Sequence, residues 1–178
     1  MTTKSSRWDP NMIVAVSAVF IGICALFVSI VQTNLQRKQS YAATWPYLEI
    51  NTDMLDNQFY FSVTNKGAGP AIIKKVRLLY KGKEYASPVT LAREITGKQH
   101  AFMPYYWDRL DKRVIAPQEK IAYLTLTDKA DAEKFESALP DIQLRIAYAS
   151  VYDQLWVAFE TQDVLPIKRL KEFDVMKK

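Results

Sequence analysis

The sequence predicts one transmembrane α-helix near the N-terminus, followed by a mainly β antiparallel sandwich with short helical insertions. Two observations predict this fold class. Residues 12–31 form an apolar run that contains no charged side chain. From Trp45 onwards, apolar and polar residues alternate with the period of two that is typical of half-buried strands. A chain of 178 residues has room for one such helix and one domain of ordinary size.

The apolar run is long enough to cross a membrane. At about 1.5 Å per residue, it spans a hydrocarbon core of about 30 Å. A cleaved signal peptide is the alternative, but its apolar core is usually about 7–15 residues long and a small-residue cleavage site follows closely. Here the polar residues 32–38 separate the run from Ala42 and Ala43. We therefore expect an uncleaved anchor and, because no later segment is comparably apolar, a single crossing.

These features divide the chain into five parts: a short N-terminal tail (1–11), the transmembrane helix (12–31), a polar stalk (32–44), the β-sandwich domain (45–166) and a basic C-terminal tail (167–178). The formal net charge is +5, but four of the 24 lysines and arginines flank the apolar run, against one of the 19 acidic residues. The domain itself is therefore nearly neutral, which argues against a nucleic-acid partner.

Basic residues flank the apolar run almost equally on both sides. Lys4 and Arg7 precede it, and Arg37 and Lys38 follow it, so the positive-inside rule gives no clear orientation. The only cysteine, Cys24, lies inside the run, so the domain has no disulfide, as is usual in the cytoplasm. The basic C-terminal tail suits the anionic cytoplasmic leaflet. We expect a cytoplasmic domain, with a periplasmic domain as the alternative.

Small residues recur along the apolar run at spacings of three and four, which places them on one face of a helix. In a bilayer, small residues permit close approach of two helix backbones, so we expect this small-residue stripe to pack against another transmembrane helix. The alternative is that small residues are simply common in membrane helices. The stripe consists of Ala15, Ala18, Gly22, Ala25 and Ser29.

The same helical phase continues beyond the apolar run in Gln32, Gln36 and Gln39. We therefore expect the helix to continue as a stalk to about residue 42. It should end before Trp45-Pro46, because the residue before a proline disfavours the helical conformation.

Six strands are expected in the domain. In one of them, Phe59, Phe61 and Val63 alternate with more polar residues, and turn-forming residues stand at 56–57 and 65–70. The expected strands are residues 47–53, 58–64, 71–80, 121–127, 142–151 and 155–161.

Two short helices are expected between the strands. Ser87 followed by Pro88 is a helix start, and Gly97 stops that helix. Asp128 is expected to cap a second helix over residues 129–139. Residues 97–117 carry no clear pattern, and we expect an irregular loop there.

Residues 59–71 resemble the Val-x-Asn-x-Gly-x-x-Pro-Ala strand–turn–strand segment of bacterial immunoglobulin-like domains. The anchor, the Trp-Pro-Tyr-Leu segment from Trp45 and the tyrosine-rich residues 148–156 are together similar to a group of uncharacterised bacterial single-pass membrane proteins. The resemblance covers most of the chain. It implies an immunoglobulin-like sandwich and a bacterial inner-membrane location, and it implies no activity.

The sequence offers little for catalysis or metal binding. The one histidine, His100, stands alone, and no Cys-x-x-Cys or His-Glu-x-x-His spacing occurs. No serine-nucleophile motif and no phosphate-binding Gly-x-x-x-x-Gly-Lys loop occurs either. We expect a non-enzymatic protein without a metal or cofactor.

Basic residues gather between residues 66 and 83, where no acidic residue occurs. Such a basic ribbon could bind anionic lipid, a phosphate or an acidic partner. The alternative is that its lysines protect an exposed strand edge from aggregation. The basic ribbon consists of Lys66, Lys74, Lys75, Arg77, Lys81 and Lys83.

An aromatic run interrupts the irregular residues 97–117. It could cover one end of the core, or it could be a partner surface, where tyrosine and tryptophan are enriched. The residues of the aromatic run considered for a partner are Phe102, Tyr105, Tyr106 and Trp107.

Together these features predict a membrane-anchored interaction module that self-associates through its helix or meets a membrane partner protein there. Two alternatives remain open. One is an oligomerising effector of a bacterial defence or toxin system, triggered by a ligand at the basic ribbon. The other is a periplasmic scaffold of an envelope complex.

Overall fold

The computed structural model of the protein describes residues 9–99 and 101–176. It separates into an N-terminal helical unit and a domain that begins at Ala43. The helix α1, Pro10–Ala43, is 34 residues long. Asp9 begins it, because the Asp9 carboxylate accepts a hydrogen bond from the backbone N–H of Asn11 at 3.0 Å.

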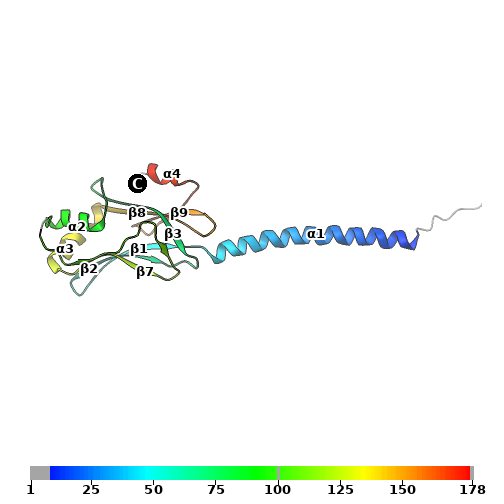
Figure 1. The fold of residues 1–178 in the computed structure, drawn as a ribbon, viewed down its shortest axis with the longest axis horizontal. Coiled ribbons are helices and arrows are strands. Elements are labelled where there is room, and N and C mark those ends of the chain that lie inside the picture. The colour runs from blue at the N-terminus through cyan, green and yellow to red at the C-terminus, as the bar shows by residue number, and fades with distance from the viewer. Residues whose placement is uncertain (1–8, 100, 177–178) are drawn as a thin grey trace, which may run out of the picture. The chain divides into compact units, whose positions relative to one another are not determined.

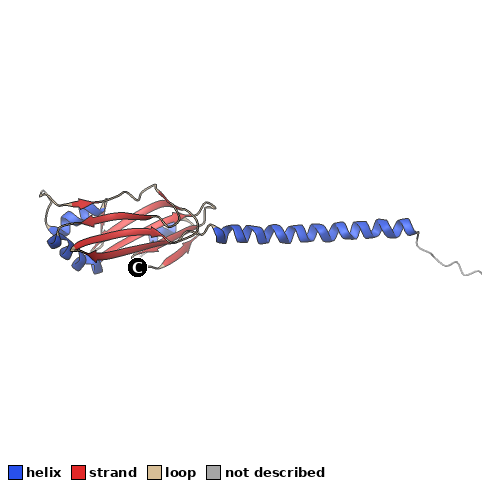
Figure 2. Ribbon diagram, turned by 90° about the horizontal axis from the view of Figure 1, so that it is seen from below, coloured by secondary structure: helices blue, strands red, loops and turns tan. Residues whose placement is uncertain are grey.

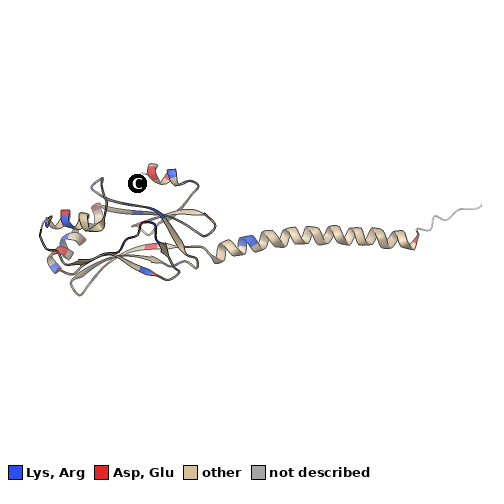
Figure 3. Cartoon of the chain, in the orientation of Figure 1, with Lys and Arg blue, Asp and Glu red and all other residues tan. Residues whose placement is uncertain are grey.

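Helix α1 is unbroken from the apolar run through the stalk (Figure 1), as the sequence predicted. None of its residues is buried. Figure 3 colours basic residues on α1 only towards its C-terminal end. It is the one helix of the described residues that is long and apolar enough to cross a membrane by length and composition.

The domain contains two antiparallel sheets. The first has four strands in the order β1-β2-β7-β5. Its strands are β1 (Leu48–Leu55), β2 (Gln58–Asn65), β7 (Lys120–Leu126) and β5 (Tyr105–Tyr106). The second has six strands, five of them in the order β10-β9-β8-β3-β4, with β6 paired to β3. Its strands are β10 (Val164–Ile167), β9 (Leu155–Phe159), β8 (Ile142–Ala149), β3 (Ala71–Tyr80), β4 (Lys83–Tyr85) and β6 (Val114–Ile115).

The buried faces of both sheets meet in one hydrophobic cluster. Alternation places Phe59 and Phe61 of β2 in it from one sheet, and Leu144 and Ile146 of β8 from the other. Phe135 of helix α3 (Lys129–Ala138) packs on Phe59, with 4.9 Å between ring centroids. Burial of these side chains is the main stabilising contribution to the domain.

Two helices lie at one end of the domain (Figure 2). In α2, Pro88–Thr96, the Ser87 hydroxyl accepts a hydrogen bond from the Thr90 N–H, and Gly97 ends the helix in the left-handed conformation at φ 74°. In α3, Lys129–Ala138, the Asp128 side chain caps the first turn. Both helices and their caps confirm the sequence prediction. The short 3₁₀-helix η1, Leu139–Asp141, follows α3.

The six predicted strands are confirmed with ends that differ by at most two residues. The short strands β4, β5, β6 and β10 were not predicted, and β5 and β6 lie within residues 97–117, where we expected an irregular loop. The segment expected as a basic tail, residues 167–178, contains the last residue of β10 and a further helix, α4, Leu170–Val175.

The turn after β2 is hydrogen-bonded to the first residues of the domain through one side chain. The buried side chain of Asn65 accepts hydrogen bonds from the backbone N–H of Tyr47 at 3.2 Å and of Gly67 at 3.0 Å. It donates to the backbone carbonyls of Gly69 at 2.8 Å and Ile115 at 3.0 Å. One asparagine therefore joins the segment before β1, the turn after β2 and strand β6.

Close approach explains both glycines of this turn. A Cβ at Gly69 would lie 1.9 Å from the carbonyl oxygen of Thr44, and one at Gly67 would lie 2.4 Å from that of Trp45. Real Cβ atoms do not come so near to backbone atoms, so the turn requires glycine at both positions.

Candidate functional site

The register of β3 and β8 builds a mixed surface on the side of the six-stranded sheet away from the core. Arg77 pairs with Arg145 across the two strands, and Lys75 pairs with Ala147. Lys74 lies in the bulge of β3 and has no pairing partner there. We call this surface the outer face; it consists of Lys75, Arg77, Arg145, Ala147, Val157 and Phe159.

Helix α4 covers the apolar half of the outer face. Phe173 is fully buried and forms a second, separate hydrophobic cluster on this side of the sheet. The chain reaches this position because β10 returns along β9 and leads into α4 (Figure 1). The other buried members of the cluster are Ala147, Val157, Phe159 and Ile167.

The basic half of the outer face meets an acid from the same helix. The Asp174 carboxylate lies 2.5 Å from the Lys75 Nζ and 3.8 Å from an Arg77 guanidinium nitrogen. The backbone carbonyl of Asp174 accepts a hydrogen bond from Arg77 at 3.3 Å, and that of Met176 accepts one from Arg145. Three cations from two strands thus converge on one carboxylate and two carbonyl oxygens.

The pKa of the Asp174 carboxyl is lowered, chiefly by the hydrogen bond from Lys75. A carboxylate with a lowered pKa favours the docked helix at neutral pH, because the ionised form is the one that the cations stabilise. Asp174 therefore neutralises part of the positive charge that Lys75 and Arg77 place on the outer face.

Only two members of the basic ribbon, Lys75 and Arg77, contribute to this convergence. Three others pair with acidic residues in different places: Lys66 with Glu49 at 2.6 Å, Lys81 with Asp141 at 3.7 Å and Lys83 with Glu94 at 3.6 Å. Among the described residues, no ion pair involves Lys74. The ribbon is therefore not one surface in space.

Arg145 is the site residue that sequence reasoning missed. It stands inside the apolar strand β8, on the polar phase of the alternation together with Gln143. A single arginine at such a position was a usable signal. Its partner across the sheet could not be read from sequence, because Arg77 is far away along the chain.

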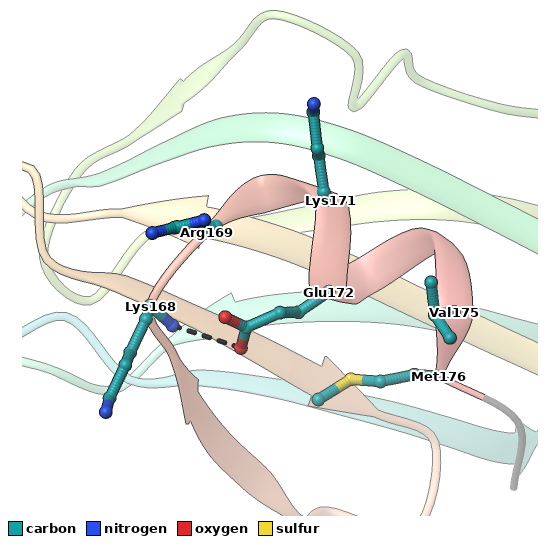
Figure 4. A pocket seen from close by; sticks show the side chains of 6 residues that line it. All are labelled: Lys168, Arg169, Lys171, Glu172, Val175 and Met176. Carbon is teal, nitrogen blue, oxygen red and sulfur yellow. Dashed lines mark hydrogen bonds between the residues drawn. The ribbon is translucent and has the colours of Figure 1, made fainter.

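The side of α4 that faces away from Phe173 carries basic residues and borders only a shallow cavity. It bounds an open cavity of about 600 Å³ that is lined by Lys168, Arg169, Lys171, Glu172, Val175 and Met176. The side chains of Lys168, Arg169 and Lys171 point in different directions (Figure 4). The Glu172 carboxylate accepts a hydrogen bond from the Lys168 backbone N–H at 3.2 Å. These cations do not converge on a common point, so they do not build a site for one anion.

The aromatic run divides between surface and core. Phe102 is 87% exposed and Tyr106 71% exposed, whereas Tyr105 is half-buried and packs against the core. Trp107 is 41% exposed and borders a cavity of about 150 Å³. Burial raises the pKa of the Tyr123 phenol, which also lines that cavity. The run thus covers part of the core and also leaves aromatic surface in the solvent.

The small-residue stripe lies wholly on α1, where every described side chain is exposed apart from the half-buried Ser40. Cys24, also on α1, is a free and exposed cysteine. Among residues 9–99 and 101–176, no three His, Cys, Asp or Glu side chains gather closely enough to hold a metal ion. His100 lies outside the described residues.

Over residues 12–164 the chain matches the family described as "Domain of unknown function (DUF8453)", and it belongs to that family. The match includes the apolar part of α1 and every strand of both sheets up to the start of β10. Neither the curated proteins nor the solved structures contain a match.

Proposed function

We propose that this member of the DUF8453 family is a bacterial, membrane-anchored, non-enzymatic binding module that self-associates through α1 and binds an anionic group of a partner on its outer face. One observation carries the proposal. Lys75 and Arg77 converge on the Asp174 carboxylate of the chain's own last helix, and Arg145 beside them donates to the Met176 carbonyl. An anionic group of a partner that replaced the Asp174 carboxylate would meet the same cations.

Anchoring is supported by the continuity of α1. Its apolar part, residues 12–31, contains no charged side chain, and the helix continues for about three further, mainly polar turns to Ala43. A signal peptide would require a shorter apolar core of about 7–15 residues and an accessible extended cleavage segment. A helix that runs through this region favours an uncleaved anchor.

Self-association is supported by the small-residue stripe. Without hydrophobic driving force in lipid, helices associate through close packing and polar contacts, and small residues permit that packing. The spacing of three and four residues favours a left-handed crossing of two such helices. The partner is a second copy of α1 or a helix of another membrane protein.

The oligomeric state of the full chain in mild detergent tests self-association. Gly22→Leu places a large side chain on the stripe, so we expect it to shift the protein from oligomer to monomer in light-scattering measurements. Val28→Leu changes a large residue on another face and is the matched control; it should leave the mass unchanged. A wild-type chain that is monomeric at all concentrations would refute this part of the proposal.

The outer face is tested with a fluorescent glutamate oligopeptide and the full chain in nanodiscs of neutral lipid. Asp174→Asn removes the competing carboxylate and should raise the affinity for the peptide. Lys75→Ala combined with Arg77→Ala should abolish binding, whereas Lys129→Ala, on the exposed face of α3, should not. Equal binding by all four proteins would refute an anion site on the outer face.

The domain is further proposed to be an immunoglobulin-like sandwich of the kind found in uncharacterised bacterial single-pass membrane proteins. Two antiparallel sheets that share one core support this. The turn with the sequence Asn-x-Gly-x-Gly-Pro-Ala supports it as well. Its Asn65 side chain hydrogen-bonds to the backbone, and the backbone approaches Gly67 and Gly69 too closely for a side chain at either position.

A second candidate is a membrane effector that clusters when a ligand displaces α4. The combination of a covered basic surface and a small-residue stripe in one chain favours it. Overexpression in a bacterial host tests it: toxicity that Gly22→Leu abolishes and Val28→Leu preserves would support an effector. If neither the wild-type chain nor Asp174→Asn affects growth, the effector candidate is refuted and the binding module remains the proposal.

A cytoplasmic domain is proposed over a periplasmic one, on the net basic C-terminal residues 167–178 and the absence of cysteine from the domain sequence. Labelling in intact cells decides between them. In a Cys24→Ser background, Lys129→Cys places one thiol on an exposed position of α3. A membrane-impermeant maleimide should label it only after the inner membrane is permeabilised. Labelling of intact spheroplasts would place the domain in the periplasm and favour an envelope scaffold.

A further inference from the structure

A cavity of about 260 Å³ opens between the two sheets, where the edge strand β1 faces β8 and the turn after β9. Its walls are mainly apolar. The apolar lining includes Ile50, Phe61, Leu139 and Ile142, and the polar lining consists of Thr52 and Glu160. The volume is close to the lower end of small-molecule pockets, which begin at about 300 Å³.

One carboxylate oxygen of Glu160 is buried and accepts no hydrogen bond from any described residue. No ion pair among residues 9–99 and 101–176 involves Glu160. The backbone next to it is well ordered by hydrogen bonds, because Phe159 donates to the Asp163 carbonyl at 3.0 Å and accepts from Gln162 at 3.0 Å. This oxygen of the half-buried Glu160 side chain is therefore placed by a tight turn and lacks a partner among the described residues.

A buried polar atom without a partner is costly, and a carboxylate more so than a neutral group. The missing partner has to bring positive charge and an N–H donor, since charge-assisted hydrogen bonds to carboxylates are the strong ones. It also has to bring apolar surface, because the rest of the cavity would otherwise face water. A metal ion fits poorly, because the cavity supplies one carboxylate and no further charged oxygen ligands.

We propose that this cavity binds a small primary ammonium ion with an apolar body, with its nitrogen on Glu160 and its hydrocarbon part against Ile50, Phe61 and Ile142. Thr52 offers a hydroxyl as a second acceptor in the same cavity. The site is independent of the outer face, which lies on the opposite side of the six-stranded sheet from the core.

Benzylammonium chloride is the probe, and benzyl alcohol is its neutral control of similar size and shape. Both are titrated into the ¹⁵N-labelled full chain in detergent, with the amide signals of Ile50 and Ile142 as the readout. We expect benzylammonium to shift these signals with a dissociation constant at least about tenfold lower than that of benzyl alcohol. Glu160→Gln should remove this difference while it preserves the shape of the side chain.

Glu133→Gln, on the exposed face of α3, is the matched control and should bind the probe like the wild type. Loss of binding in Glu160→Gln through unfolding is checked by urea denaturation; removal of a carboxylate that has one buried oxygen without a partner should leave the midpoint equal or higher. The proposal is overturned if Glu160→Gln binds benzylammonium as tightly as the wild type, if benzyl alcohol binds equally well, or if neither probe moves the two signals.

Discussion

Replacement of Asn65 by alanine should destabilise the domain more than any other single change of a polar residue. The substitution removes all four hydrogen bonds that the side chain makes with Tyr47, Gly67, Gly69 and Ile115. Asn65 is fully buried, so water cannot replace its amide without rearrangement of the turn. Four backbone groups that now have partners would lose them.

At about 1 kcal/mol for each hydrogen bond, the four contacts correspond to a loss of about 3–4 kcal/mol in the free energy of unfolding. This is a large share of the 5–15 kcal/mol that is typical of a domain. Urea denaturation of the full chain in detergent, followed by tryptophan fluorescence, measures it. With a denaturant slope of about 2 kcal/mol per molar, the midpoint should fall by about 1.5–2 M.

Asn51→Ala is the control, because Asn51 is a half-buried asparagine of the neighbouring strand β1 and should change stability by at most about 0.5 kcal/mol. Asn65→Asp gives a second test. It retains the oxygen that accepts from Tyr47 and Gly67, but its second carboxylate oxygen would face the carbonyls of Gly69 and Ile115, which raises its pKa above the ordinary value of about 3.9. The variant should therefore regain stability as the pH falls, when protonation restores a donor. An Asn65→Ala midpoint within 0.3 M of the wild type, on the order of the control, would refute the role assigned to this side chain.

Three further outcomes follow from specific contacts. Gly69→Ala should destabilise by about 2–3 kcal/mol in the same urea experiment, because its Cβ would lie 1.9 Å from the Thr44 carbonyl oxygen. Docking of α4 should be strongest at neutral pH and should weaken as the pH falls below the ordinary aspartate pKa of about 3.9, because the lowered pKa of Asp174 means that its ionised form stabilises the docked helix; Phe173 still holds the helix on the sheet when Asp174 is protonated. Hydrogen exchange of the α4 amides should therefore accelerate as the pH falls, and exchange that is independent of pH after correction for intrinsic rates would contradict this. Phe173→Ala should release α4 and accelerate exchange in residues 170–175 by two or more orders of magnitude, at about 3 kcal/mol lost, whereas the amides of β8 should remain protected.

The long strands were predictable because their signal is local. Strand β3 matches its predicted range of 71–80 in full, since its alternation and the turn residues on both sides lie within a few positions. Strands β5 and β6 carry no such signal. Each is two residues long and exists only because it pairs with a distant strand, β5 with β7 and β6 with β3. Pairing of this kind follows from the tertiary fold and not from local sequence.

Helix α4 was not predicted, because its segment is rich in basic residues and its apolar residues were overlooked. Lysines and arginine around it led us to expect a basic tail, yet Leu170, Phe173 and Met176 recur at a spacing of three, and Phe173 is fully buried. The apolar half of the outer face that receives Phe173 is formed by strands β8 and β9 together. No window of the sequence contains both the helix and its docking surface, so the contact could not be predicted.

The candidate site was half predictable for the same reason. Lys75 and Arg77 share one face of a strand by the period of two, and the sequence places them together correctly. Arg145 joins them through the register of β3 and β8, and Asp174 joins them through the return of β10 along β9. The positions of Arg145 and Asp174 beside Lys75 and Arg77 thus depend on pairing between strands that are distant in the sequence, which the local pattern does not reveal.

The outer face has a basic half and an apolar half, so a ligand can bind to the basic half alone or to both halves. An anion that replaces only the Asp174 carboxylate can bind while Phe173 stays in its cluster, because the cations and the apolar residues occupy separate halves. A ligand that needs the whole face must also expose Phe173, whose burial contributes about 1.5–3 kcal/mol, equivalent to about a 10- to 150-fold loss of affinity. Asp174→Asn should therefore strengthen the first kind of ligand with α4 still docked, and Phe173→Ala should strengthen the second. If Asp174→Asn raises the affinity and the α4 amides stay protected from exchange, the ligand replaces only the Asp174 carboxylate. If Phe173→Ala raises the affinity and the α4 amides exchange quickly, the ligand binds after α4 leaves the outer face.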